Sequence, residues 1–334
     1  MPLFTGFRFG FGRSAAEGGY DSSGPLQASG GNAEYTYNSK KIHVFTASGS
    51  LTCTNGSSTC EVFVVGGGGA GANGACGGGG GGGVRNITTP FPVGPGETYT
   101  ITVGGGGVSP TGTANNGYAG GDSSIVDLAA PTNKVFATGG GAGKYETGPS
   151  NPGGGSAGGG HGWDGPGGEA VVSPDGISPT TQGYDGGAGN GWSNGGGGGG
   201  GAAAVGAGGA GKTGAEGGIG VKIPTTFQDP TNPYGAAGNP TEPKWWFAGG
   251  GAGGGWSPTG GGASDGGSNP GNPNGPWAGS GDGTGNASAN APLGEGAGWP
   301  GTANTGGGAG GGSSHTPSPG GAGGSGIVFI AYPT

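Results

Sequence analysis

The sequence predicts a mainly β and irregular protein, essentially without α-helix, in which a small β-structure is combined with a sandwich of stacked polyglycine-II helices. Glycine supplies 103 and proline 26 of the 334 residues, more than an ordinary globular chain carries. No segment repeats apolar residues at the helical period of 3.6, and each glycine in a helix interior costs about 1 kcal/mol relative to alanine. A few short runs alternate apolar and polar residues, which is typical of strands.

This composition is also typical of disordered chains. Only 8% of the residues are charged, however, and the net charge of −8 is modest for the length. Seven Trp, nine Tyr and eleven Phe remain available for packing, whereas disordered chains are poor in aromatic residues and rich in charge. We therefore expect an ordered protein.

The charge and hydropathy patterns argue against a nucleic-acid-binding, a membrane-spanning or a secreted protein. Ten scattered Lys and Arg residues form no basic stripe, so we expect no nucleic-acid partner. There is no apolar run of about 18 residues, so we expect no membrane span. The first twenty residues lack the continuous apolar centre of a secretion signal, so we expect no export by the general secretory route.

Residues 1–40 form the first predicted unit, which begins with alternating aromatic residues and glycines. Exposed rings in such number favour insertion into a partner, where the rings become buried and the arginines become paired. The alternative is that this head folds back on its own domain. The residues predicted to attach the chain to its partner are Phe4, Phe7, Arg8, Phe9, Phe11 and Arg13.

Residues 41–138 form a β-rich, glycine-rich unit, and residues 326–334 a closing strand. The strand-like runs are KIHVFTASGSLTC (41–53), CEVFVV (60–65), ETYTITV (97–103), KVFAT (134–138) and GIVFIAY (326–332). Cys53 and Cys60 flank TNGSST between two of these runs, so a cross-hairpin disulfide and two small buried thiols are both open readings. Cys76 has no evident partner.

Residues 139–325 are predicted to form the polyglycine-II sandwich, with aromatic and polar loops between glycine runs. Ordering glycine is entropically costly, and a run without side chains can be compensated only through its backbone. In a left-handed helix of three residues per turn the amides point outward, and neighbouring helices without Cβ atoms can pair with them. The run 195–201 would span about 22 Å. Because the glycine runs have no unbroken three-residue register, collagen is excluded.

One motif matches a phosphate-binding loop: Gly206 followed by Gly211, Lys212 and Thr213. Such a loop needs a strand before it and a helix after it, and the flanking glycine runs provide neither. His43, His161 and His315 have no cysteine or carboxylate cluster near them in sequence, and His161 with Asp164 reads as solvated loop. We expect no catalytic residue, no metal and no cofactor, and hence no enzyme.

Aromatic residues gather between the glycine runs, most densely in PKWWFAGGGAGGGW (243–256). Aromatic side chains supply a large contact area at low entropic cost, which suits a receptor-binding loop. The alternative is that they pack on the rim of their own stack. The predicted receptor-contacting residues are Tyr234, Trp245, Trp246, Phe247 and Trp256.

Six segments follow one another along the chain: KIHVFTASGSLTC, EVFVVGGGGAG, PGETYTITVGGGG, GGDSSI, TGGGAG and GGSGIVFIAYP. Their order resembles the glycine-rich domain of bacteriophage tail fibres and tail-tip adhesins, and the likeness covers residues 41–333. The resemblance implies a virion protein, assembled in the host cytoplasm, whose packed polyglycine-II helices present loops to the host surface. Its partners would be other virion proteins, through the head, and a cell-surface glycan or outer-membrane protein.

Three functions therefore stay open. The first is a tail-fibre or tail-tip receptor-binding protein, for which a homotrimer is one oligomeric state. The second is a capsid decoration or head-fibre protein, which predicts many copies per particle. The third is a cellular glycine-rich structural protein, which predicts insolubility and tandem repeats.

Overall fold

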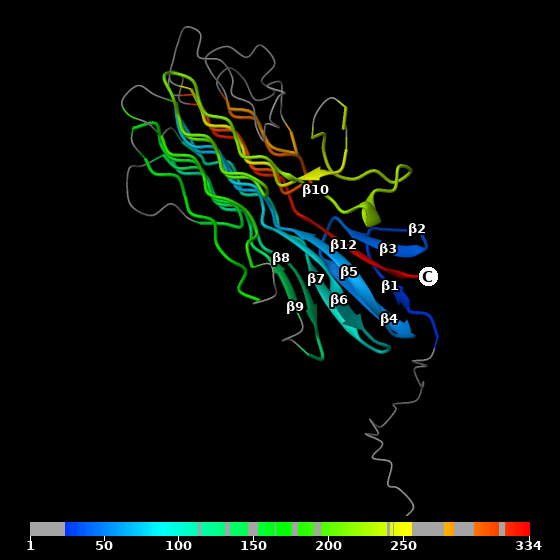
Figure 1. Ribbon diagram of the computed structural model, residues 1–334. Helices are drawn as coiled ribbons and strands as arrows, with labels where there is room; N and C mark the ends of the chain where they lie inside the picture. Colours follow the sequence, from blue (N-terminus) through cyan, green and yellow to red (C-terminus); the bar gives the residue numbers. More distant parts are fainter. Residues whose placement is uncertain are drawn as a thin grey trace, which may run out of the picture.

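The computed structural model describes residues 24–112, 115–130, 134–145, 153–163, 165–175, 180–189, 191, 195–238, 241–242, 244–255, 277–283, 297–313 and 318–334. These residues form a β-sandwich at one end and a bundle of extended glycine-rich segments at the other (Figure 1). The predicted class is confirmed, since the described part of the chain contains strands, one short 3-10 turn and no α-helix.

The sandwich consists of two antiparallel five-stranded sheets. The first has the order β2-β3-β12-β5-β6, with β2 at Ala33–Tyr37, β3 at Lys40–Phe45, β12 at Ile327–Pro333, β5 at Ser58–Val65 and β6 at Val84–Val93. The second has the order β1-β4-β7-β8-β9, with β1 at Gln27–Ser29, β4 at Gly49–Asn55, β7 at Thr98–Thr102, β8 at Ser123–Asp127 and β9 at Lys134–Ala137.

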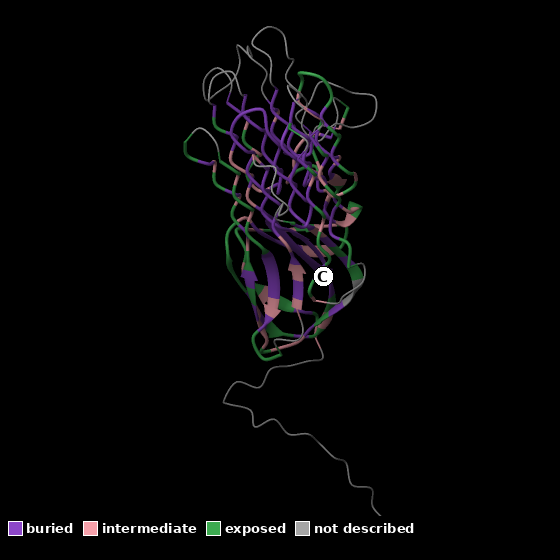
Figure 2. Ribbon diagram, turned by 90° about the vertical axis from the view of Figure 1, so that its left-hand side faces the viewer, coloured by how far each residue is buried: buried purple, intermediate pink, exposed green. Residues whose placement is uncertain are grey.

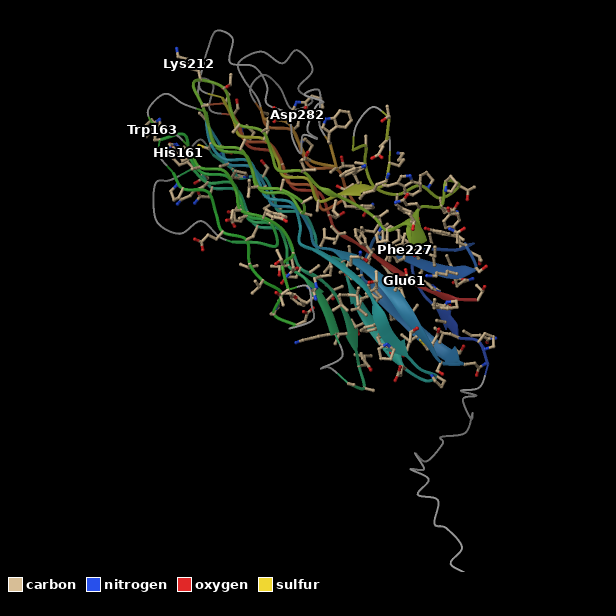
Figure 3. The ribbon with its side chains drawn as sticks, viewed as in Figure 1. Glu61, His161, Trp163, Lys212, Phe227 and Asp282 are labelled. Carbon is tan, nitrogen blue, oxygen red and sulfur yellow. The ribbon has the colours of Figure 1, made fainter. Side chains whose placement is uncertain are left out.

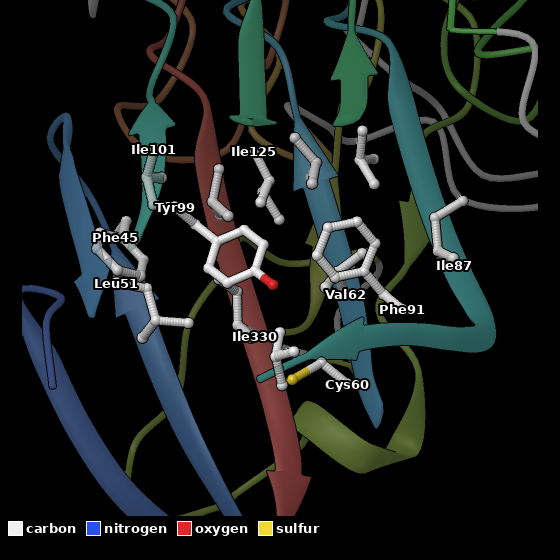
Figure 4. Close-up of a cluster of buried hydrophobic side chains, with 14 of the residues drawn as sticks. Phe45, Leu51, Cys60, Val62, Ile87, Phe91, Tyr99, Ile101, Ile125 and Ile330 are labelled. Carbon is white, nitrogen blue, oxygen red and sulfur yellow. The ribbon is translucent and has the colours of Figure 1, made fainter. Parts of the chain in front are cut away.

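Strand β5 shows why the first sheet is buried on both faces. Its residues alternate sides, so Val62 and Val64 point into the space between the sheets, whereas Phe63 and Val65 point to the other face. Between the sheets lies a cluster that includes Leu51, Tyr99, Ile125 and Ile330 (Figure 4). Continuous apolar runs of this kind are typical of strands covered on both sides.

The outer face of the first sheet is covered by a segment inserted between two glycine runs. It comprises β10 (Val221–Lys222), the 3-10 turn η1 (Thr225–Phe227) and β11 (Trp246–Phe247). Phe227 and Phe247 lie against Phe63 and Phe329, with ring centroids 5.4 to 6.5 Å apart. This aromatic cluster attaches the inserted segment to the sandwich.

The glycine bundle grows directly out of the strands: β5 continues into segment 66–72, segment 77–83 leads into β6, and segment 318–325 leads into β12. The bundle segments run side by side and are largely buried (Figure 2). The described segments are 66–72, 77–83, 104–111, 116–122, 138–145, 153–161, 165–172, 182–189, 195–201, 204–210, 214–219, 248–255, 278–283, 297–302, 306–313 and 318–325.

Segment 77–83 shows how the bundle is bonded. The N–H groups of Gly78 and Gly81 donate to segment 195–201, those of Gly79 and Gly82 to segment 306–313, and those of Gly80 and Gly83 to segment 138–145, over 2.7 to 3.1 Å. Its carbonyls accept from three other segments, 66–72, 153–161 and 248–255. The change of partner with a period of three is the pattern that three residues per turn produce.

The stretch 195–219, which contains the phosphate-loop match at 206–213, belongs to this bundle. Residues 195–201 are surrounded by other segments, and the N–H of Gly218 donates to the carbonyl of Gly199 over 2.8 Å. Residues 204–210 and 214–219 are bundle segments joined by a turn at Gly211, where φ is +61°. The residues after Thr213 therefore continue as extended chain, not as the helix that a phosphate loop requires.

Two predicted boundaries do not match the described structure. Strands β1 and β2 lie within residues 24–40 and pair with β4 and β3, so this part of the first predicted unit belongs to the sandwich. Segments 66–83 and 104–122 lie within the predicted β-rich unit, yet they bond into the bundle. Sandwich and bundle are thus interleaved along the chain, because the chain enters and leaves the bundle several times.

The structure distinguishes between the two alternatives for Cys53 and Cys60, a disulfide or two buried thiols. Cys53, Cys60 and Cys76 are buried free thiols. Cys53 and Cys60 belong to the cluster between the sheets, and burial raises the pKa of Cys53 to about 11 and that of Cys60 further. Of the two open readings, the structure therefore has the two buried thiols and not the disulfide, and Cys53 and Cys60 act as small apolar core residues.

Candidate functional site

The candidate site is the end of the bundle that lies opposite the sandwich, which we call the distal rim. Its described residues include the connections 73–76, 115–116, 161–163 and 211–213 and the segment ends at 145, 283 and 313. Figure 3 shows His161, Trp163 and Lys212 at this end, far from Glu61 and Phe227 in and beside the sandwich. The rim is where side chains reappear, because the bundle interior is nearly all backbone.

Side-chain amides hold the segment ends at the rim. Asn73 is fully buried, and its Nδ2 donates to the Gly112 carbonyl while its Oδ1 accepts from the Gly320 N–H over 2.9 Å. The Oδ1 of Asn116 accepts from the N–H of Tyr145 over 2.7 Å. Buried backbone groups need partners, and asparagine supplies them where the regular pattern of the bundle stops.

Three aromatic side chains form a row on the rim, which we call the aromatic row: Tyr145, His161 and Trp163. The rings of Tyr145 and His161 meet edge to face at a centroid distance of 5.3 Å, and those of His161 and Trp163 do the same, also at 5.3 Å. Such edge-to-face pairs are favoured by the ring quadrupoles. The row therefore holds the outermost ring, that of Trp163, in a fixed orientation.

The backbone of the connection reinforces this arrangement. The N–H of Gly165 donates to the carbonyl of His161 over 2.9 Å, and the N–H of Trp163 donates to the His161 Nδ1 over 3.1 Å. His161 is nearly buried, whereas 39% of Trp163 is exposed. The indole ring thus projects from a tight turn whose base is packed.

The row carries little charge at its surface. Desolvation and, second, the nearby Lys144 lower the pKa of His161 below its ordinary value of 6.5, so its ring is neutral at pH 7. Lys144 is itself buried. The exposed face of the row is therefore aromatic and uncharged.

The structure places four of the five predicted receptor-contacting residues away from this rim. Phe247 is fully buried in the aromatic cluster over the first sheet, so its prediction as a contact residue is wrong. Tyr234 and Trp245 are half-buried and pack against the same cluster. The half-buried Trp246 donates from Nε1 to Glu242 over 2.7 Å. Trp256 lies outside the described residues.

Tyr234 and Trp245 therefore serve mainly to pack the inserted segment on the sandwich, whereas Trp246 is held within that segment by its hydrogen bond to Glu242. This is the alternative in which the aromatic residues pack against their own domain, although the surface they cover is the sheet and not the distal rim. Sequence reasoning missed the aromatic row. Its signal was present in the HGWDG turn between two glycine runs, which indicated an exposed tryptophan but not the approach of Tyr145.

The predicted attachment residues Phe4, Phe7, Arg8, Phe9, Phe11 and Arg13 lie outside the described residues. The first described residues, Gly24 and Pro25, lie beside Gly56, in the turn between β4 and β5. Residue 334 pairs with Ser39 in the turn between β2 and β3. Both described ends of the chain thus lie on the sandwich side of the molecule, opposite the distal rim.

Comparison with known proteins identifies the class. The model of the glycine-rich domain family matches residues 45–333, so the chain belongs to that family. This match agrees with the glycine-rich domain expected from the sequence, but it does not tie the chain to phage tail fibres. No curated protein matches the chain. Within the described residues, no helix is long and apolar enough to cross a membrane.

Proposed function

We propose that this chain is a bacteriophage virion structural protein without enzymatic activity, which recognises the host at the tip of a tail fibre through its distal rim. The observation that carries the proposal is the polarity of the molecule. The described chain begins at residue 24 on the sandwich end, whereas the connections 73–76, 115–116, 161–163 and 211–213 lie at the other end of the bundle. Attachment and recognition can then occupy opposite ends.

The bonding of the bundle suits this role. Its segments are held mainly through backbone hydrogen bonds such as those of Gly78 to Gly197 and Gly79 to Ala309, so its stability depends little on exposed rim side chains such as that of Trp163. Loops on a rigid scaffold can change in sequence without loss of the fold. A receptor-binding protein that must follow changes in its host surface benefits from this independence.

A reconstruction of the particle that contains the chain tests the proposal. We expect a few copies at a fibre tip, with residues 1–23 inserted into the fibre and Trp163 facing outward. The same reconstruction counts the copies at each tip, and so tests the homotrimer. Many copies on the shell lattice would instead establish the capsid decoration or head-fibre function. A chain found only in a cell wall or another cellular structure would overturn both the tail-fibre and the capsid functions.

A further inference from the structure

We propose that the aromatic row on the distal rim is a carbohydrate-binding platform, on which the exposed indole of Trp163 stacks against the ring of a neutral hexose in a cell-surface glycan. This inference rests on the proposed host-recognition function, which it makes specific. The observations that carry it are the fixed orientation of the indole and the absence of surface charge on the row.

The indole of Trp163 is held in place by neighbouring rings. Trp163 is held edge to face on His161, which is held in the same way on Tyr145, and the Tyr145 ring lies over Gly74, where an added Cβ would lie 3.6 Å from the ring. The indole of Trp163 is thus supported, through His161 and Tyr145, by the buried connection 73–76. A ring that is already ordered loses little entropy on binding.

The exposed part of the row carries no charged side chain. It consists of the indole of Trp163 and part of the half-buried Tyr145 ring, since His161 and Lys144 are buried, and the chain as a whole carries −8. An acidic sugar or a phosphate group would meet no exposed cation on the row and would be repelled by the chain. The C–H face of a neutral hexose carries weak positive polarisation, which matches the negative face of an aromatic ring.

The row is small compared with a protein interface. A stable protein partner covers about 800 Å² on each side, whereas the row exposes only part of one indole and of one phenol ring. One hexose ring has the dimensions of one indole. A glycan therefore fits the row better than a folded protein does.

The test uses the full chain on an array of glucose, galactose and mannose oligosaccharides, with sialylated and phosphorylated glycans on the same array. We expect binding to at least one neutral oligosaccharide. Trp163→Ala should weaken this binding at least about 10-fold, and Trp163→Phe should keep it within about 3-fold. Tyr184→Ala is the matched control, because Tyr184 is 42% exposed but lies near the sandwich end of the bundle. It should leave binding unchanged.

Binding to acidic glycans alone, or binding that Trp163→Ala does not change, would overturn the inference, as would no binding to any neutral sugar. A second measurement separates this failure from failure of the proposed function. Labelled chain is added to host cells treated with periodate, which destroys sugar diols, or with protease. Loss of cell binding after periodate supports the inference. Loss of cell binding only after protease overturns the inference and leaves host recognition intact. No binding to untreated host cells overturns host recognition itself.

Discussion

Gly79 has no room for a side chain. Its N–H donates to Ala309 and its carbonyl accepts from Gly251, both over 2.8 Å, and an added Cβ would lie well inside 3.0 Å of the Gly69 carbonyl oxygen. The obstacle is backbone, which cannot rotate away. We expect Gly79→Ala to lower the free energy of unfolding by at least about 2 kcal/mol, as overpacking of a dense interior does. Denaturant titration of the purified variant measures this.

Gly105→Ala is the control for this prediction. Gly105 is exposed at the edge of the same bundle, and an added Cβ would meet nothing within 4 Å. Its replacement removes entropy from the unfolded chain, so we expect a gain of about 0.4 to 1 kcal/mol. Equal losses in the two variants would mean that the bundle rejects alanine for its backbone conformation and not for its close packing.

His43 makes the sandwich sensitive to mild acid. It is fully buried between the carbonyl of Gly30, 2.7 Å from Nδ1, and the hydroxyl of Tyr332, 3.0 Å from Nε2. Desolvation lowers its pKa below 6.5, although the Gly30 bond and the charge of Glu34 oppose the shift. The unfolded chain therefore binds the proton first. Stability is complete above about pH 6.5 and is lost as the pH falls toward the lower folded pKa.

We expect the wild-type chain to lose unfolding free energy between pH 7 and pH 5.5, by no more than about 1.4 kcal/mol per pH unit for each such histidine. His43→Asn keeps a donor toward Gly30 and removes the titration, so its slope should be shallower. His161→Asn should remove a second part of the pH dependence of the unfolding free energy, because burial lowers the pKa of His161 as well. An unchanged slope in both variants would assign the acid sensitivity to carboxylates.

At the scale of elements, Phe227 is one of the aromatic residues that attach the inserted segment 221–247 to the sandwich. Its ring is fully buried, 5.5 Å from Phe329 and 6.5 Å from Phe63. Phe227→Ala leaves a cavity and should cost about 3 kcal/mol of unfolding free energy. Leu128→Ala, at a residue that is 62% exposed, should cost less than about 0.5 kcal/mol. If both variants unfold like wild type, the segment is not part of the cooperative fold.

The strands show what the sequence can predict. Strands β5 and β12 were predicted because their apolar runs are long enough to be recognised by themselves. Strand β6 was missed because it contains prolines, yet Pro92 pairs with Thr59 at the edge of the first sheet, where a missing N–H is tolerated. The buried ion pair of Arg85 with Asp175, at 3.2 Å, joins residues ninety positions apart, and no local pattern indicates it.

The site was harder to predict than the strands for a related reason. All glycine runs look alike in sequence, so nothing in the sequence tells which run bonds to which, and hence which connections meet on the rim. Phe247 was assigned to a receptor loop because it precedes a glycine run, but Phe63 and Phe329, far away in sequence, cover it. The exposed Trp163 is held in place by Tyr145 through His161, and no spacing rule relates these residues.

At the scale of the whole molecule, sandwich and bundle should unfold together. The chain passes directly from β5 into segment 66–72 and from segment 77–83 into β6, and segment 77–83 bonds to neighbours that range from residue 66 to residue 309. The bonds of this segment cannot be completed before distant segments arrive, so we expect slow folding, on the scale of milliseconds to seconds or longer. The amides of segment 77–83 should exchange hydrogen only through global unfolding.

Native-state hydrogen exchange measures this directly. The amides of segments 66–72, 77–83 and 195–201 should show the same opening free energy as those of β5 and β12, and Gly79→Ala should lower all of them by the same amount. Gly105→Ala should not lower any. If the bundle amides exchanged at a lower free energy while β5 stayed protected, the bundle would be a separate cooperative unit. The backbone bonds would then be too weak to couple it to the sandwich, despite the continuous chain between them.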